Sequence, residues 1–196
     1  ERIEARLLLA HCSGRSKSWL IAHGDEPAGA ALAGIAAQWF SRLRAGEPMA
    51  YLLGEKEFFS HRFHVGPGVL IPRPETELLV QWGLEVLQAT PGTALKALDL
   101  GCGSGCIGLS LALEARRLGL PLGALTQSDI AVEAITFTRR NAGVLGVAQW
   151  PDFDYQLLQG SWFEALPAEQ GFDLILSNPP YIRADDAHLL QGDLRH

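Results

Sequence analysis

Apolar side chains recur at helical spacing through the first fifty residues of the chain. Two short stretches, 3–12 and 16–22, have this spacing. In the longer stretch 28–45 the apolar residues at helical spacing are Leu32, Ile35, Ala36, Trp39, Phe40 and Leu43. Gly14 follows the first stretch and Gly46-Glu47-Pro48 follows the third, as residues that stop helices do. The pattern predicts a small helical domain over residues 1–50, with its aromatic side chains in the core.

The pattern then changes to one that is typical of strands. Apolar and aromatic residues over 51–59 and 63–70 predict two strands around a turn at residues 60–62. Gly66-Pro67-Gly68 breaks the second of them. We therefore expect residues 51–72 to form a β-hairpin that links two domains.

Beyond residue 73, predicted strands alternate with predicted helices. The helices are expected at 75–87, 107–118 and 132–141, and the strands at 96–100, 122–128, 155–159 and 172–177. Alternation of this kind indicates parallel pairing in a doubly wound, Rossmann-like α/β sheet. We expect such a domain over residues 73–196, where the sequence supplies four strands.

Composition and charge narrow the class of protein. The chain has 196 residues, 47% of them hydrophobic, and a formal charge of −6, which suits one globular domain with a small appendage. The sequence contains no apolar run near the roughly 20 residues that cross a bilayer, and its charged start does not resemble a signal peptide. Three cysteines without CxxC spacing favour a reducing compartment. We expect a cytoplasmic monomer that binds neither a membrane nor, given its acidic charge, nucleic acid.

A glycine-rich loop follows the first strand of the predicted sheet. Between Asp99 and the next helix, residues 101–105 read Gly-Cys-Gly-Ser-Gly, at a strand end where α/β sheets bind ligands. Residues 103–108 also satisfy the dinucleotide pattern GxGxxG. Against that alternative, Asp99 would repel a pyrophosphate, and Asp129 lies thirty residues beyond it instead of about 20. An acid at each of two strand ends instead suits S-adenosylmethionine, which carries an ammonium group, two ribose hydroxyls and no phosphate.

The last predicted strand ends in Asn178-Pro179-Pro180-Tyr181. Proline fixes φ and holds the preceding residue extended, so Asn178 would present its amide and the following carbonyls as a rigid, acceptor-rich corner. Such a corner suits a planar NH2 group. Taken by themselves, these four residues leave open a simple proline-rich turn after a buried strand.

With these motifs the chain resembles, nearly end to end, the HemK/PrmC family of protein-(glutamine-N5) methyltransferases that modify peptide chain release factors. Besides the helical start, the matching segments are Gly46-Glu47-Pro48, Tyr51 to Gly54, Gly68 to Glu77, Asp99 to Gly105, Asp129, Trp162-Phe163 and Asn178 to Tyr181. The most specific of them is Ile71-Pro72-Arg73-Pro74-Glu75-Thr76-Glu77, because the Asn178 motif is shared with DNA and RNA amino-methyltransferases. Ser161 stands where the family usually has aspartate, and Thr126-Gln127-Ser128 before Asp129 lacks the small apolar lead-in that is usual in the family.

The resemblance implies methyl transfer from S-adenosyl-L-methionine to the side-chain amide nitrogen of a glutamine (the GGQ motif) in a release factor, with S-adenosyl-L-homocysteine as the product. We expect that substrate to dock on the N-terminal helices while the sheet domain carries out the chemistry. The cofactor contacts that it implies are Asp99, Gly101, Cys102, Gly103, Ser104, Gly105, Asp129, Trp162 and Asn178. The catalytic residues that it implies are Asn178, Pro179, Pro180 and Tyr181. We expect no metal ion, since Asp185, Asp186 and His188 lack a fourth ligand.

Two other functions remain open at this point. The same corner could serve an amino-methyltransferase that acts on a nucleic-acid base, or the chain could be an inactive fragment that only binds cofactor. The family's sheet has seven strands and this sequence supplies four, so we expect a partial sequence. In that case the strand that carries Asn178 lies at an edge of the sheet.

Overall fold

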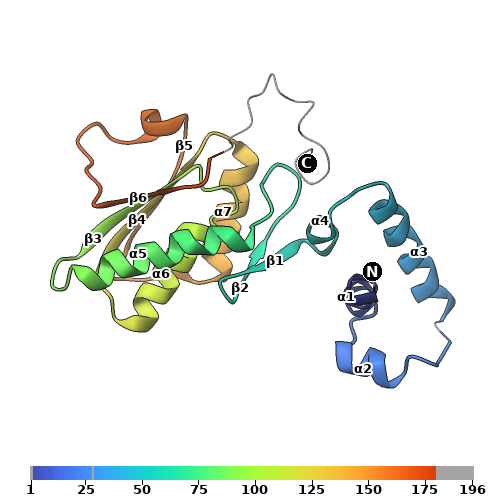
Figure 1. The fold of residues 1–196 in the computed structure, drawn as a ribbon. Coiled ribbons are helices and arrows are strands. Elements are labelled where there is room, and N and C mark those ends of the chain that lie inside the picture. Colours follow the sequence, from blue (N-terminus) through green and yellow to red (C-terminus); the bar gives the residue numbers. More distant parts are fainter. Residues whose placement is uncertain (1, 28, 180–196) are drawn as a thin grey trace. The chain divides into compact units, whose positions relative to one another are not determined.

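The computed structural model describes residues 2–27 and 29–179. It divides the chain into two compact units, Glu1–Gly54 and Glu55–His196, and each is described by itself (Figure 1). The division falls after Gly54, whereas the sequence pattern placed it after residue 50. Within the described residues, no helix combines the length and the apolar character needed to cross a membrane.

The first unit is helical, as predicted. It contains α1 (Arg2–Ser13), α2 (Lys17–Ala22), α3 (Ala30–Arg44) and α4 (Met49–Leu53). Ser16 directly precedes helix α2, and its hydroxyl accepts a hydrogen bond from the Trp19 amide at 3.1 Å and so caps the first turn. Leu8 on α1 is completely buried, and α1 contacts each of the other three helices. These contacts make α1 the centre of the unit.

The strand predicted over residues 51–59 is wrong in its first part, because residues 49–53 form helix α4 and the strand begins only at Glu55. Pro48, directly before the helix, is extended, and Gly54 ends the helix with a left-handed φ of 70°. A short apolar run bounded by proline and glycine has the same appearance in a helix and in a strand. Periodicity therefore could not decide between them.

The second unit begins with a two-stranded antiparallel hairpin, β1 (Glu55–Phe58) and β2 (His61–His64). Its turn consists of Phe59 and Ser60, with φ of 50° and 62°, and not of residues 60–62 as predicted. Positive φ at both positions is typical of two-residue hairpin turns, but such turns normally carry glycine, asparagine or aspartate. The predicted strand over 63–70 ends at His64. Phe58 and Phe63 are buried with their rings edge to face.

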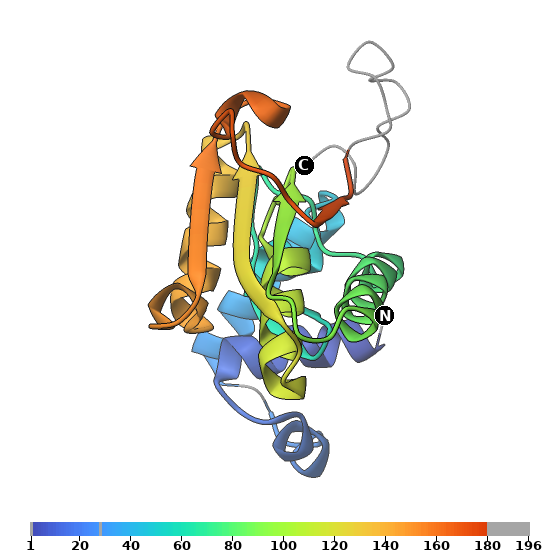
Figure 2. The same cartoon turned by 90° about the vertical axis from the view of Figure 1, so that its left-hand side faces the viewer.

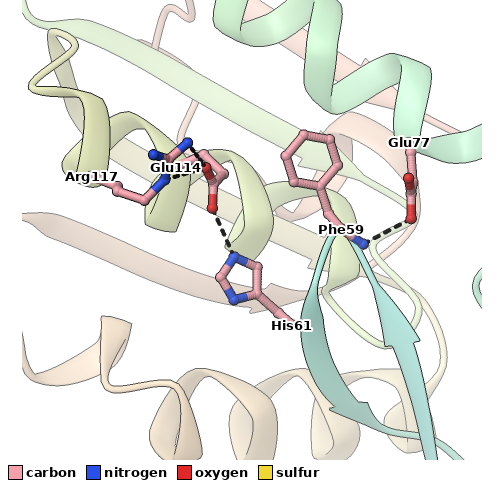
Figure 3. A network of polar contacts seen from close by, with 5 residues as sticks. All are labelled: Phe59, His61, Glu77, Glu114 and Arg117. Carbon is pink, nitrogen blue, oxygen red and sulfur yellow. Dashed lines mark hydrogen bonds and ion pairs between the residues drawn. The ribbon is translucent and has the colours of Figure 1, made fainter.

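Two polar contacts hold this hairpin against the helices that follow (Figure 3). The Phe59 amide donates to Glu77 Oε1 at 2.9 Å, and His61 Nε2 lies 3.1 Å from Glu114 Oε1. Arg117 donates through Nε to the other oxygen of Glu114 at 2.7 Å. Contacts from Glu77 and Glu114 thus hold the strained hairpin turn. With this support the turn keeps positive φ angles without glycine.

The remainder of the second unit is an α/β sheet, as predicted. Its elements in chain order are η1 (Pro74–Thr76), α5 (Glu77–Ala89), β3 (Leu95–Leu100), α6 (Cys106–Leu118), β4 (Leu122–Asp129), α7 (Val132–Val144), η2 (Val147–Gln149), β5 (Asp154–Gln159), η3 (Trp162–Ala165) and β6 (Leu174–Ser177). The four strands β3 to β6 pair in parallel, and their order across the sheet is β5-β4-β3-β6 (Figure 2). In the described part of the chain, β6 is therefore an edge strand that pairs with β3.

Helices α5, α6 and α7 pack on one face of this sheet (Figure 2). Right-handed crossovers that step in one direction, from β3 to β4 and from β4 to β5, place their helices on the same face. The largest fully buried apolar side chains in the unit are Phe58, Phe63, Val65, Val80, Leu87, Leu98, Leu109, Leu111, Leu125 and Val147. The chain then returns from β5 past β4, where Gln170 donates to the Thr126 hydroxyl at 3.3 Å, and continues to β6. Strand order reverses at β3, and α/β sheets bind ligands at such a reversal.

Candidate functional site

Three predicted site residues meet at one edge of the sheet, which we call the carboxyl edge and define by the ends of β3, β4 and β6. Asp99 is the penultimate residue of β3, Asp129 is the last residue of β4, and Asn178 directly follows β6. In the parallel register Leu100 pairs with both Ser128 and Ser177, so the three strand ends lie level. Parallel pairing thus collects residues that are far apart in the sequence.

The loop over residues 101–105 follows β3 at this edge, and its glycines have distinct roles. Gly101, Gly103 and Gly105 have φ of 73°, 56° and 80°, a region that disfavours other residues. A Cβ on Gly105 would lie 2.9 Å from a methyl carbon of Thr138, so this glycine is required for packing. At Gly101 and Gly103 a Cβ would meet no atom within 4 Å, so the loop leaves free space on that side.

Three successive carbonyl oxygens of the loop are bound by side chains from α7 and β4. Thr138 donates to the Gly103 oxygen at 3.0 Å, Asn141 to the Ser104 oxygen at 2.8 Å, and Gln127 to the Gly105 oxygen at 3.2 Å. All three donors are buried. A loop whose carbonyls are fixed in this way is preorganised, which lowers the entropy cost of binding a ligand.

Asn141 also joins the loop to the hairpin. Its Oδ1 accepts from the His64 amide at 2.7 Å, and its Nδ2 donates to the His64 carbonyl at 3.0 Å. Asn141 is 1% exposed, so its side-chain amide makes these hydrogen bonds from a buried position. Sequence reasoning missed Thr138 and Asn141. The only available signal was a pair of polar residues among the apolar positions of a helix.

Asp99 is completely buried, and one of its two oxygens is paired. Oδ2 accepts from the Gly108 amide at 2.9 Å and from Gln127 Nε2 at 2.7 Å, while Oδ1 has no hydrogen-bond partner among the described residues. Tyr155 in turn donates to Gln127 Oε1 at 3.1 Å. Gln127, one of the three residues before Asp129 that depart from the family's usual apolar lead-in, is therefore the central residue of a buried network. A Cβ on Gly108 would lie 2.8 Å from Gln127 Nε2, so α6 approaches this network closely.

Burial raises the pKa of Asp99 from 3.8 to about 6, although the hydrogen bonds from Gln127 and Gly108 oppose the shift. The folded chain thus binds this proton more tightly than the unfolded chain does. The contribution of Asp99 to stability is fully present below about pH 4, and it is lost as the pH rises through about 6. A difference of about 2 pKa units corresponds to about 3 kcal/mol.

We therefore expect the free energy of unfolding of the wild-type chain, relative to that of Asp99→Asn, to fall by up to about 3 kcal/mol between pH 4 and pH 7. Asparagine cannot ionise, and its oxygen can still accept the two hydrogen bonds. Urea unfolding of both chains without cofactor at a series of pH values measures this difference. A difference that stays constant over the range would contradict the raised pKa.

The two cysteines of the loop region are packing residues. Cys102 and Cys106 are buried, and burial raises the pKa of both thiols. Cys102 Sγ lies 3.4 Å from the Thr138 hydroxyl, and its amide donates to the Ser128 carbonyl at 3.0 Å. A buried thiol with a raised pKa is a poor nucleophile at neutral pH, so both positions disfavour thiolate chemistry. Ser104 is likewise buried beside them.

Asp129 ends β4 at the carboxyl edge, and the chain passes beside it just before Trp162. Asp129 accepts from the Gly103 amide at 2.9 Å and from the Ala131 amide at 3.0 Å, which leaves each oxygen a further lone pair. The Gly160 amide donates to the Asp129 carbonyl at 3.0 Å and brings the next segment alongside. Trp162, the first residue of η3, has a φ of 47° and is 59% exposed. An aromatic residue in this strained region is a true outlier, and such outliers cluster at functional sites.

Asn178 is partly buried and is held by its side chain. Its Nδ2 donates to Thr76 Oγ1 at 3.1 Å, and the preceding Ser177 hydroxyl donates to the Leu100 carbonyl at 2.7 Å. Pro179 is exposed beside it.

The predicted residues Pro180 and Tyr181 lie outside the described residues, as do Asp185, Asp186 and His188. In the described ranges no group of three or more His, Cys, Asp or Glu residues could hold a metal ion.

Comparison with known proteins gives matches over both units. Residues 1–54 match the family model "PrmC N-terminal domain", and residues 75–191 match "Methyltransferase small domain".

The curated relatives include release factor glutamine methyltransferases from three bacteria. That of Bordetella pertussis is 47% identical over 194 residues, which are 99% of this chain and 67% of the relative. Those of Burkholderia pseudomallei and Neisseria gonorrhoeae are 42% and 41% identical, over 100% and 99% of this chain and 66% of each relative. The chain thus spans about two thirds of the length of these relatives.

Proposed function

This chain belongs to the family of release factor glutamine methyltransferases, and we propose that it transfers a methyl group from S-adenosylmethionine to a glutamine side chain of a peptide chain release factor. The observation that carries the proposal is the position of Asn178. It stands at the carboxyl edge beside the glycine loop, with its amide fixed by Thr76 of the family-specific segment 71–77. The cofactor side and the substrate side of such a reaction would meet there.

The residues on the cofactor side fit S-adenosylmethionine. The unpaired buried Oδ1 of Asp99 suits the cationic amino group of the methionine part, and Asp129 retains lone pairs for ribose hydroxyls. Gly101 and Gly103 leave space for a ligand against the main chain, and exposed Trp162 offers a flat apolar surface. When bound, the cofactor supplies an electrophilic methyl group on its sulfonium.

The task on the substrate side is to make an amide nitrogen reactive. Its lone pair is delocalised into the carbonyl, so the nitrogen is a poor nucleophile. Asn178 Oδ1 and the Pro179 carbonyl would accept its two N–H bonds, which fixes the direction of the lone pair and stabilises the positive charge that develops on nitrogen. Pro180 and Tyr181 would line the slot and cover the plane of the amide. A strong general base is not needed, because the alkylated nitrogen is acidic and loses its proton afterwards.

Methyl transfer assays with isotopically labelled cofactor test this proposal on the complete natural protein. We expect label on a release factor, and none on the same factor when the glutamine of its GGQ motif is replaced. DNA and RNA are assayed in parallel, because an amino-methyltransferase for nucleic acid would label them. Label on either, or cofactor binding without transfer to any substrate, would refute the proposal. The formal charge of −6 speaks against nucleic acid.

We further propose that the helical unit docks the protein substrate. Removing residues 1–54 should then raise KM for the intact release factor about tenfold or more, the equivalent of about 1.4 kcal/mol of lost binding. KM for a short peptide that carries the same glutamine should remain unchanged, because the sheet unit alone would contact it. Steady-state kinetics with both substrates measure the two values. An unchanged KM for the intact factor would refute a docking role.

A further inference from the structure

The described residues give the side chain of Asn178 one hydrogen-bond partner, Thr76. Its Oγ1 lies 3.1 Å from Asn178 Nδ2, and the two residues are 102 positions apart in the chain. Thr76 is 7% exposed, so water competes little for this contact. The pairing joins the segment 71–77, which identifies the family, to the residue proposed to hold the substrate.

Thr76 is itself held rigidly. It is the last residue of η1, and its amide donates to the Arg73 carbonyl at 3.0 Å. The next residue, Glu77, begins α5 and accepts a hydrogen bond from the Phe59 amide at 2.9 Å, which ties this turn to the hairpin (Figure 3). A hydroxyl on a backbone fixed on both sides can determine the orientation of a group that it contacts.

The orientation of the Asn178 amide decides what the substrate meets. A rotation of 180° would exchange its oxygen and its NH2, and a threonine hydroxyl can pair with either. With NH2 turned outward, Asn178 would present donors to the NH2 group of the substrate, which is itself a donor. With NH2 on Thr76, as observed, Oδ1 remains free to accept a substrate N–H.

We propose that Thr76 is a positioning residue that holds Asn178 Nδ2 and thereby reserves Asn178 Oδ1 for the substrate amide. The inference rests on the proposed function and adds a residue with a defined role to it. Thr76 acts through Asn178 and does not itself touch the reacting atoms. Its effect should therefore disappear when the side chain of Asn178 is removed.

The test compares Thr76→Val, which keeps the shape and removes the hydroxyl, with Thr76→Ser, which keeps the hydroxyl. In the complete protein we expect Thr76→Val to lower kcat about tenfold, with KM and cofactor affinity changed less than about twofold. Thr76→Ser should restore most of kcat. In an Asn178→Ala background, Thr76→Val should have no further effect on kcat, since coupled residues are not additive. An unchanged kcat in Thr76→Val, or an equal loss in both backgrounds, would overturn the proposal.

A readout that does not depend on activity separates this inference from the proposed function. The side-chain amide 15N–1H signals of Asn178, assigned by their loss in Asn178→Ala, should shift and exchange faster with water in Thr76→Val. They should stay close to their wild-type positions in Thr76→Ser. Unaltered Asn178 signals in Thr76→Val would refute the role of Thr76, whereas a wild-type protein that leaves release factor unmethylated would refute the proposed function. Thermal melts show whether each variant is folded.

Discussion

Asn178→Ala should lower kcat for methyl transfer by about two to three orders of magnitude, the loss seen when an enzyme loses a group that stabilises transition-state charge. The side chain would accept an N–H bond that strengthens as the substrate nitrogen becomes positive, so its loss raises the barrier more than it weakens binding. Cofactor affinity should change only a few-fold, because Asp99, Asp129 and the loop remain in place. Single-turnover kinetics and cofactor titration measure the two quantities.

Gln88→Ala provides a matched control for this variant. It removes another side-chain amide from the same unit, at an exposed position near the end of α5 and away from the carboxyl edge. We expect its kcat to remain within about twofold of the wild-type value. If Asn178→Ala behaved like this control, Asn178 would not be the acceptor for the substrate amide.

Asn141→Leu should lower the free energy of unfolding by about 3 kcal/mol or more, since each buried polar group that loses its partner costs about 1–3 kcal/mol. Leucine has a similar size but leaves the His64 amide, the His64 carbonyl and the Ser104 carbonyl without this partner. Water cannot replace the lost hydrogen bonds easily, because the position is buried. Urea unfolding followed by circular dichroism measures the loss.

The exposed neighbour Arg140 supplies the control on the same helix. Arg140→Leu introduces the same leucine at an exposed position, and it should alter stability by about 0.5 kcal/mol or less. A loss in Asn141→Leu as small as that of the control would mean that the hairpin and the loop are not joined through this residue.

The parts of the fold that the sequence predicted correctly are those with strong periodicity. Helices α5 to α7 and strands β3 to β5 lie close to their predicted ranges, because alternating apolar runs separated by glycine and proline have few other solutions. Helix α4 was missed because five apolar residues are too few to distinguish a helix from a strand. The hairpin turn at Phe59 was missed because Glu77, eighteen residues away, holds a conformation that the turn residues themselves disfavour.

The candidate site divides in a similar way. The placement of Asp99, Asp129 and Asn178 at one edge of the sheet could be predicted, because each lies at or next to a strand end and parallel strands bring their ends together. The residues that hold them, among them Gln127, Asn141 and Thr76, could not be assigned roles. They act through contacts between elements far apart in the sequence, and a polar residue on a helix or strand does not reveal which backbone group it will meet.

The pairing of β6 with β3 has a consequence for the order in which the site forms during folding. Ser177 meets Leu100 across 77 residues and Asn178 meets Thr76 across 102, whereas Gln127, Thr138 and Asn141 reach the glycine loop across 22, 35 and 37 residues. Contacts that close long loops form late, because the chain entropy must be lost before the contact can stabilise the structure. The cofactor half of the site should therefore gain protection from hydrogen exchange before the corner at Asn178 does. On a ribosome, the chain would complete its acceptor corner only after the strand that precedes it had emerged.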